Sequence, residues 1–296
     1  MLRRPLPALA LCVALAACGG DDAPTSRLSG LLLDGELAET SGLAASRAHP
    51  GTLWLVEDGG NPARLHAVSR RGRRIASYDV EGTSNTDWED LAAFEHGGRR
   101  YLLVADTGDN GGLRRTLLLH AIEEPAQLRD GDTLRPAWSI AFRWPDGARD
   151  CEAVAVDAAN GQVLLVSKKR RPPELFALPL EPAGKAGVQT ARPLGRLAGI
   201  SGSGPVDDSA RLLAQVSAAD LSPDGRVLAV LTYGGLHLYR RAPGEAWGGA
   251  AAGTPDRRDV PWLHQPEALG WSANGRGLYA TGEFSPAPLV FLPLDP

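Results

Sequence analysis

The sequence contains too few cysteines to build a disulfide framework. Three occur in 296 residues, and two of them, Cys12 and Cys18, belong to the N-terminal apolar stretch. Only Cys151 then remains, so we expect no internal disulfide and a fold held by its hydrophobic core, for which roughly 270 residues suffice. Cys151 stands at a repeated position that elsewhere holds other residue types, which predicts a packed core thiol and not a nucleophile.

A second long apolar run and an excess of positive charge are also missing. No run of 18 apolar residues follows the N-terminal stretch, so no transmembrane helix is predicted. The formal net charge is −4 and no segment is strongly basic. Nucleic acid is therefore not an expected partner, and we expect a monomer.

Several common catalytic and metal-binding motifs are absent. The chain has no Gly-x-Ser-x-Gly elbow, no His-Glu-x-x-His pair, no Gly-Lys-Ser/Thr phosphate loop and no EF-hand loop. The oxygen-rich run Asp106–Asn110 lacks the twelve-residue spacing of an EF-hand. His264, three residues before Glu267, is the one histidine that we consider as a candidate catalytic acid or base.

The N-terminus has the pattern of an export signal. Arg3 and Arg4 precede an apolar run over residues 6–17 that is too short to span a bilayer. The following Leu-Ala-Ala-Cys at residues 15–18 resembles the lipobox of bacterial lipoproteins, which implies cleavage before Cys18 and lipidation of this residue. Removal of residues 1–17 changes the formal net charge from −4 to −6 because two arginines and no acid are lost.

These features predict the domain organisation and the location. Residues 1–17 form a lipoprotein signal peptide, residues 18–27 a lipid-anchored tether, and residues 28–296 a single domain. The membrane is then a partner through the N-terminal lipid. The residue after Cys18 is Gly19 and not Asp, and in this the sequence resembles lipoproteins that are passed on to the outer membrane. We therefore expect a cell-envelope protein that faces the periplasm or the cell surface.

The rest of the chain repeats one pattern, a polar residue before an apolar run and then a second β-rich run. Five copies align on Leu43, Leu91, Val154, Leu221 and Leu269. By subtraction, their spacings are 48, 63, 67 and 48 residues, and four-stranded propeller blades repeat at roughly 40–50 residues. The longer spacings leave room for insertions.

The repeats predict an all-β propeller of five four-stranded blades. Six blades are the alternative if the interval 154–221 contains a degenerate blade. The last repeat, from Glu267 to Pro296, has room for three strands only. We therefore expect Leu28–Leu37 to supply the fourth strand and close the ring, which also removes exposed sheet edges. Outer strands are expected at Ile75–Val80, Ala137–Phe142, Val188–Leu194 and near Val260.

In a propeller, the start of each inner strand and the loop after the second strand open on one face at the axis. This places Ser41, Glu89, Glu152, Ala219 and Glu267 in one ring. Converging glutamates repel one another unless a cation offsets their charge, and Ca²⁺ accepts six to eight oxygens in flexible geometry. We therefore predict a calcium site from Glu89, Glu152 and Glu267, with Asp106, Asp109 and Asn110 nearby. The alternative is that backbone amides or basic side chains neutralise the glutamates.

A basic loop lies on the same predicted face. Lys168, Lys169, Arg170 and Arg171 follow a second strand, and beside a metal they would suit a small anionic ligand such as a phosphate or carboxylate. The alternative is a solvated turn. His66, His120 and His237 occupy the same place in three third strands, away from the axis, so we expect a packing role for them.

The set of motifs resembles secreted bacterial propellers of uncharacterised function. It comprises Thr-Ser-Gly-Leu-Ala at 40–44, Trp-Glu-Asp-Leu-Ala at 88–92, Asp-Thr-Gly-Asp-Asn at 106–110, Glu-Ala-Val-Ala at 152–155, Ser-Pro-Asp-Gly-Arg at 222–226 and Pro-Glu-Ala-Leu at 266–269. These propellers are distantly similar to the calcium-dependent β-propeller phytases and to the gluconolactonase and paraoxonase group. The resemblance implies calcium ligands at inner-strand starts, like Glu89, Glu152 and Glu267, but Ser41 and Ala219 depart from this pattern.

Three functions remain open at this point. The first is a lipid-anchored propeller that binds a divalent metal and an anionic ligand without turnover. The second is a calcium-dependent hydrolase, phytase-like or lactonase-like, that uses the basic loop at residues 168–171 for charge stabilisation. The third is a protein-interaction scaffold of the cell envelope. Propellers serve all three functions, so the fold does not choose among them.

Overall fold

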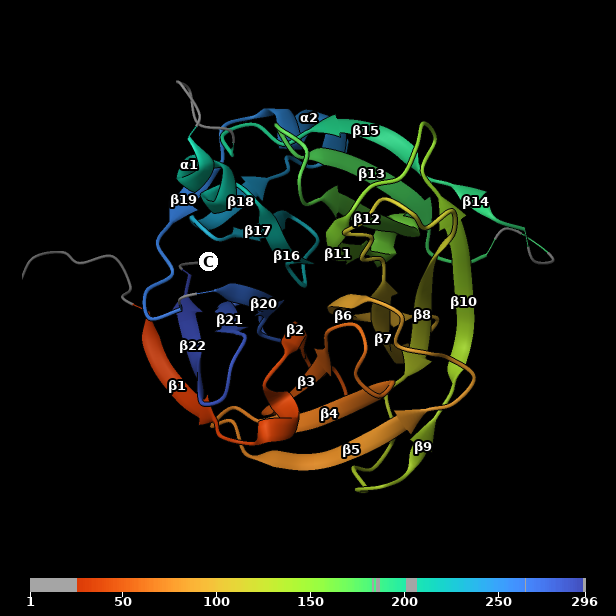
Figure 1. Cartoon of the computed structure of the whole chain (residues 1–296), viewed down its shortest axis with the longest axis vertical. Coiled ribbons are helices and arrows are strands. Elements are labelled where there is room, and N and C mark those ends of the chain that lie inside the picture. The colour runs from red at the N-terminus through yellow and green to blue at the C-terminus, as the bar shows by residue number, and fades with distance from the viewer. Residues whose placement is uncertain (1–25, 183, 185–186, 201–206, 264, 295–296) are drawn as a thin grey trace, which may run out of the picture.

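Five antiparallel sheets stand around a common axis (Figure 1). The computed structural model describes residues 26–182, 184, 187–200, 207–263 and 265–294. The expected signal peptide and Cys18, the tether up to residue 25, and His264 lie outside these residues. No helix in the described part is long and apolar enough to cross a membrane.

Blades 1 and 2 are built from consecutive hairpins. Blade 1 consists of β2 (Thr40–Ala45), β3 (Thr52–Glu57), β4 (Arg64–Ser69) and β5 (Arg74–Val80). Blade 2 consists of β6 (Trp88–His96), β7 (Arg99–Asp106), β8 (Leu117–Glu123) and β10 (Pro136–Arg143). In each blade the first strand lies at the axis and the last at the rim (Figure 1).

Blades 3 and 4 repeat this arrangement. Blade 3 consists of β11 (Cys151–Asp157), β12 (Gln162–Ser167), β13 (Glu174–Pro179) and β15 (Arg192–Arg196). Blade 4 consists of β16 (Val216–Leu221), β17 (Val227–Thr232), β18 (Gly235–Arg240) and β19 (Asp256–Arg258). Short helices occur only between strands: α1 (Asp208–Leu213), α2 (Trp247–Ala252), η1 (Gly35–Leu37) and η2 (Ala158–Asn160).

Blade 5 combines the two ends of the described chain. It consists of β20 (Pro266–Trp271), β21 (Gly277–Gly282), β22 (Ala287–Pro293) and β1 (Arg27–Leu32). Strand β1 pairs antiparallel with β22, and Leu28 lies opposite Val290. The predictions of five blades and of ring closure by the N-terminal strand are confirmed. Because residues 27–293 complete all five sheets, the propeller needs no strand from residues 1–26.

Insertions extend two blades at the rim. Strand β9 (Thr133–Leu134) pairs parallel with β5 of blade 1, and β14 (Gln189–Thr190) pairs parallel with β10 of blade 2. The predicted outer strand Val188–Leu194 is therefore wrong as one strand. Its first part serves the preceding blade, and the rim strand of blade 3 begins at Arg192. Pairing between blades is a tertiary contact that local strand propensity does not encode.

The core lies between the blades. Each of five clusters of buried apolar side chains fills one interface between neighbouring blades. The inner strands pack on both faces and are buried at every position of β2, β11, β16 and β20. Strands buried on both faces have continuous apolar runs, in the same way as strands of parallel sheets. Cys151 is fully buried in this core, as predicted, and burial raises the pKa of its thiol.

Candidate functional site

Every inner strand is irregular at its second residue. The pairing register between the inner strand and its neighbour shifts at this point in all five blades. The residues at the shift are Ser41, Glu89, Glu152, Ser217 and Glu267. A β-bulge leaves one residue unpaired and re-aims its side chain. The five bulges therefore present one side chain per blade at the axial mouth of the ring, called the mouth below.

The prediction of Ala219 in this ring is wrong by two residues. The structural equivalent in blade 4 is Ser217, since β16 shifts register between Val216 and Ala218. A shift by two preserves the alternation of faces along a strand, so the hydrophobic pattern could not reveal it. Ser217 donates a hydrogen bond to the carbonyl of Pro266 (2.5 Å), and Ser41 donates one in the same way to Trp88 of the next blade (2.8 Å).

Two groups of carboxylates meet at the mouth and share one member. Asp58, Asp87 and Glu89 form the first group, and Glu89, Asp150 and Glu152 form the second. Within each group, one carboxylate oxygen per residue lies within 4.8 Å of the others. Three carboxylate oxygens at this separation can contact a single divalent cation.

Glu89 is the centre of both groups. Glu89 is 5% exposed, and no basic side chain among the described residues forms an ion pair with its carboxylate, which shares a hydrogen bond with the carboxyl group of Glu152. Burial raises the pKa of Glu89 strongly, and the negative charge of Glu152 raises it further. A buried carboxylate is unfavourable unless it is paired, so Glu89 requires either a proton or a cation.

The second group already has positive partners. Lys168 Nζ lies 2.8 Å from Glu152 Oε1, and Lys169 Nζ lies 2.9 Å from Asp150 Oδ2. Burial by itself would lower the pKa of Lys168, but Glu152 outweighs burial and the pKa is raised. The first group has no such ion pair among the described residues, and burial raises the pKa values of Asp58 and Asp87. The first group is therefore the better candidate for a cation.

Two glycines make room for the first group. A Cβ atom on Gly108 would lie 2.1 Å from Glu89 Oε1 and 2.4 Å from the carboxylate of Asp87. A Cβ atom on Gly59 would lie 2.4 Å from Asp87 Oδ1. Side-chain oxygens therefore pack directly against the backbone of two loops, which only glycine permits here.

The predicted ligands after β7 each have a structural partner at one oxygen, whereas Asp106 Oδ2 and Asp109 Oδ2 are buried without a hydrogen-bond partner among the described residues. Asp106 Oδ1 pairs with Arg114 at 2.8 Å and accepts a hydrogen bond from the Asp87 amide at 3.1 Å. Asp109 Oδ1 accepts hydrogen bonds from the amides of Leu113 and Arg114. Asn110 accepts a hydrogen bond from Lys169. These contacts shape the loop that carries Gly108.

Glu267 lies beside both groups without belonging to either. Its Oε1 accepts a hydrogen bond of 2.6 Å from the hydroxyl of Tyr233. Burial raises the pKa of Glu267 to about 8, the hydroxyl and Lys168 oppose the rise, and Glu152 adds to it. Lys168 Nζ lies 6.0 Å from the centre of the Tyr233 ring, so Lys168 is between Glu152 and Tyr233. The structure thus brings Glu89 and Glu152 together and sets Glu267 apart.

Of the remaining residues of the predicted anion loop, Arg170 has an acidic partner and Arg171 has none among the described residues. Arg170 lies 3.9 Å from Glu174, and no acid pairs with Arg171 in the described part of the chain. Lys169 and Arg170 line a shallow pocket of about 290 Å³ together with Asp109 and Asp150. Mixed charges in this pocket offer less to an anion than an arginine cluster would.

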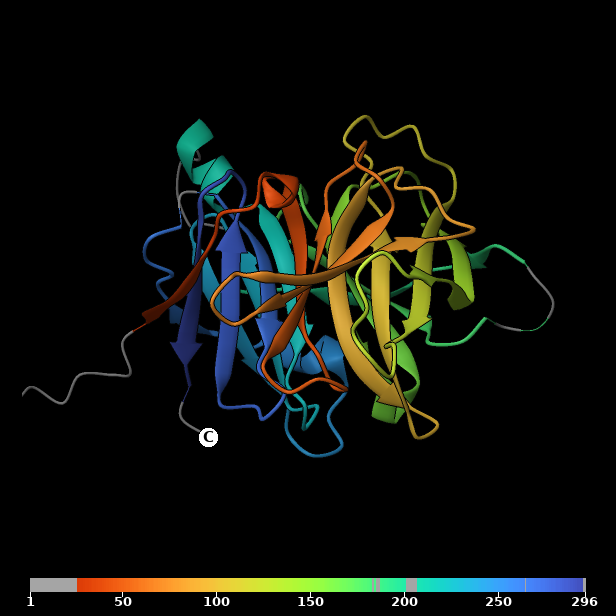
Figure 2. The ribbon, with the colours of Figure 1, turned by 90° about the horizontal axis from the view of Figure 1, so that it is seen from below.

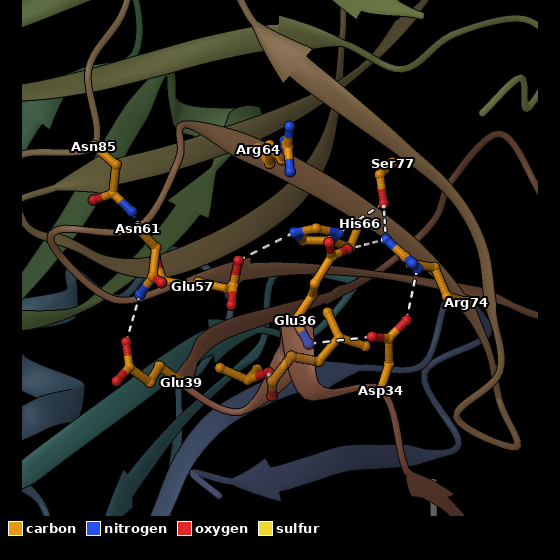
Figure 3. A network of polar contacts seen from close by, with 12 residues as sticks. Asp34, Glu36, Glu39, Glu57, Asn61, Arg64, His66, Arg74, Ser77 and Asn85 are labelled. Atoms are coloured by element: carbon orange, nitrogen blue, oxygen red, sulfur yellow. Dashed lines mark hydrogen bonds and ion pairs between the residues drawn. The ribbon is translucent and has the colours of Figure 1, made fainter. Parts of the chain in front are cut away.

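A polar network in blade 1 supports the loop that carries Asp58 (Figure 3). Asn61 and Asn85 both donate hydrogen bonds to the carbonyl of Asp58, at 3.1 and 2.8 Å. Farther along the network in Figure 3, His66 contacts Glu57 at 3.4 Å and Ser77 Oγ at 2.8 Å.

The histidine–serine contact recurs in blade 2. His120 lies 2.8 Å from Ser139 Oγ, and both pairs are directly opposite each other on strands three and four. His66 and His120 are buried. Their repetition away from the mouth agrees with the predicted packing role.

A further buried acid ties three blades together. Asp90 is fully buried, and its carboxylate accepts hydrogen bonds from the amides of Leu91, Val154 and Ala219 at 2.8, 2.8 and 3.2 Å. These amides belong to β6, β11 and β16, so Asp90 joins the inner strands of blades 2, 3 and 4. Sequence analysis overlooked it because an acid inside an apolar run gives no sign of its backbone partners.

Three members of the carboxylate groups were also missed, namely Asp58, Asp87 and Asp150. A signal for two of them exists in the sequence: Asp87-Trp-Glu89 and Asp150-Cys-Glu152 share an Asp-x-Glu spacing at the start of an inner strand. Asp58 follows the second strand of its blade, which predicts a position just outside the ring on the same face, but the sequence does not show which acids it meets there.

Comparisons with known proteins assign this chain to no family. No family model matches the chain, and no curated protein matches it. A structure of U3-55K is similar with a TM-score of 0.42 and 13% identity, over 86% of this chain and 68% of that one. A nidogen–laminin complex is similar with a TM-score of 0.46 and 12% identity, over 83% of this chain and 73% of that one.

Proposed function

We propose that this propeller binds a divalent cation, with Ca²⁺ the best fit, through Asp58, Asp87 and Glu89. The observation that carries the proposal is the carboxylate of Glu89. It is buried, has no positively charged partner among the described residues, and lies close to the carboxylates of Asp58 and Asp87. A cation removes the repulsion among the three acids and satisfies Glu89 at the same time.

The chemistry of the ligands favours a hard cation. All three side chains offer oxygen, and neither a cysteine nor a histidine belongs to either described group. Oxygen ligands suit Ca²⁺ and Mg²⁺, and Ca²⁺ tolerates irregular geometry and a larger set of ligands. Asp58 and Asp87 are only half-buried, so solvent has access for further water ligands. Glu152 and Asp150 remain neutralised by Lys168 and Lys169 in this arrangement.

Metal analysis of the purified protein tests the proposal, followed by calorimetric titration with Ca²⁺ and Mg²⁺ after chelation. We expect one calcium per chain. Asp58→Asn should weaken the affinity at least about tenfold, since it removes one of three charged ligands. Asp259→Asn is the control, because Asp259 is exposed and no basic residue in the described part of the chain forms an ion pair with it. Absence of heat with both cations, together with no metal in the protein as purified, would remove the cation site.

The proposal includes attachment to a membrane through lipidated Cys18. Its support is the lipobox-like Leu-Ala-Ala-Cys at residues 15–18 and the apolar run before it. Cys18→Ala should yield an unprocessed or released protein in cell fractionation. A variant that stays processed and membrane-bound like the wild type would contradict lipidation.

A calcium-dependent hydrolase is the second candidate. One observation favours it: Lys168 and the Tyr233–Glu267 pair lie directly beside the carboxylate groups, where charged and proton-donating groups are useful in catalysis. Assays with aryl phosphate and lactone substrates in calcium and in chelator test it. Equal rates in the two conditions would contradict calcium dependence, and the absence of a rate in both would leave cation binding without turnover.

A further inference from the structure

Five arginines surround two adjoining grooves far from the carboxylate groups. The grooves have volumes of about 800 and 820 Å³ and share Arg27, Arg70, Tyr279 and Phe291. Together the grooves contain Arg27, Arg70, Arg71, Arg73 and Arg276 and no acid. We call these five residues the arginine patch. All five are exposed, and no ion pair with an acid is found for them in the described part of the chain.

The patch contrasts with the protein around it. The chain has more acids than bases, 35 against 31, and many of its other arginines pair with acids, as Arg74 does with Asp34 at 2.7 Å. A groove with five positive charges and no acid therefore carries a strong local positive potential. Such potentials attract anionic surfaces and ligands.

The arginine turn is held rigidly in place. Residues 70–73 connect β4 with β5, and β1 lies against this turn. Ser29 Oγ donates a hydrogen bond of 2.6 Å to the Arg70 carbonyl, and the Leu31 amide donates one of 3.3 Å to the Arg71 carbonyl. The turn itself requires Gly72, whose φ is 83° and whose Cβ would meet the Leu31 carbonyl at 2.1 Å. Turn geometry thus explains the glycine but not the three arginines.

The grooves also present apolar surface. Arg27 Cζ lies 4.9 Å from the centre of the Phe291 ring, and Leu28 beside it is 54% exposed. Tyr279 completes this part of the lining. Tyr279 and Phe291 are themselves buried, so the exposed apolar contribution comes from Leu28. Basic residues around an exposed apolar side chain are typical of surfaces that bind the interface of an anionic membrane.

The position of the patch fits a membrane as its occupant. Strand β1 begins at Arg27, nine residues after Cys18, and nine residues reach at most about 30 Å. A lipid on Cys18 would therefore hold Arg27 close to the bilayer. The patch extends from the hairpin turns between β2 and β3 and between β20 and β21, at residues 51 and 274, to strand β1. Figure 2 shows β1 in red on the outer side of the ring. The carboxylate groups lie at the other end of the ring, where the inner strands β6 and β11 begin.

We infer that the arginine patch docks the propeller onto an anionic phospholipid surface. The inference rests on the proposed lipidation for its geometry, whereas the charge of the patch is independent of it. Docking would fix the orientation of the tethered ring and leave the mouth, with its carboxylate groups, facing away from the membrane.

Vesicle sedimentation tests the inference without the lipid anchor. A protein that begins at Gly19 is suitable, because residues 27–293 complete every blade. We expect it to sediment with vesicles of phosphatidylcholine and phosphatidylglycerol, but not with phosphatidylcholine alone. Raising the salt from low to molar concentration should abolish binding, since screening shortens the Debye length to about 3 Å. Failure to bind the anionic vesicles at low salt would overturn the inference and leave the calcium site and lipidation untouched.

Matched variants locate the surface. Replacement of Arg70, Arg71 and Arg73 by Gln should lower the vesicle affinity on the order of a hundredfold. Replacement of Arg192, Arg226 and Arg240 by Gln removes the same charge from exposed sites on other blades and should have little effect. Equal losses in the two variants would indicate unspecific attraction and overturn the docking surface. Binding of inorganic phosphate in solution, without vesicle binding, would likewise overturn it in favour of a soluble anion.

Discussion

Replacement of Glu89 by Gln tests whether the mouth holds a cation. Gln keeps nearly the same shape but loses the charge, and Glu89 is the only residue shared by the two described carboxylate groups. Calcium at a hundredfold excess over its dissociation constant stabilises the folded protein by about 2.7 kcal/mol. For a domain of this size, 1 kcal/mol shifts Tm by about 2–4 °C. We therefore expect calcium to raise the Tm of the wild type by roughly 5–10 °C over chelator.

The Tm of the variant should depend much less on calcium. Glu89→Gln should lose most of the calcium-induced rise, because the cation loses its buried ligand. In chelator it should be at least as stable as the wild type, since the variant no longer buries the Glu89 carboxyl group next to the negative charge of Glu152. Differential scanning calorimetry in calcium and in chelator measures both effects.

Glu95→Gln provides the control. Glu95 lies on the same strand β6 at its far end, and its contact with Arg100 is an exposed pair at 3.5 Å, which contributes little to stability. A full calcium-induced rise in Glu89→Gln would refute the assignment of the cation to this residue. An unchanged wild-type Tm between calcium and chelator would refute the cation site itself.

Three further predictions follow from the same geometry. Gly108→Ala should abolish the calcium-induced rise in Tm while leaving every acid in place, because the added Cβ would lie 2.1 Å from Glu89 Oε1; Gly35→Ala, with open space around it, should not. In chelator, the Tm of the wild type relative to that of Glu267→Gln should fall as the pH rises from 4.5 to about 8. The reason is the raised pKa of Glu267, because the folded state retains a proton that the unfolded state has released. A difference in Tm that is constant with pH would contradict this. Asp90→Ala should lower the free energy of unfolding by about 3 kcal/mol or more, since three buried amides lose their acceptor. A loss below about 1 kcal/mol, measured by denaturant unfolding, would contradict this.

The architecture could be predicted because it depends on local pattern. Five apolar runs with polar residues before them defined the inner strands, and a last repeat with room for three strands implied that the N-terminus supplies the fourth. Each inner strand is buried on both faces, so its composition alone identifies it. The same pattern could not distinguish Ser217 from Ala219, because a shift of two residues keeps the same face of the strand. It also could not assign residues 189–190 to the preceding blade.

The carboxylate groups were only half predictable, for a physical reason. Glu89 and Glu152 occupy equivalent bulges, and equivalence between repeats is visible in the sequence. Which charged side chains face one another, however, depends on loop paths and on packing between blades. Tertiary contacts alone bring Asp58 to Glu89, pair Lys168 with Glu152, and direct Glu267 toward Tyr233. The repeated strands thus placed the acids at one end of the ring, and the folded loops decided which acids lack a positive partner.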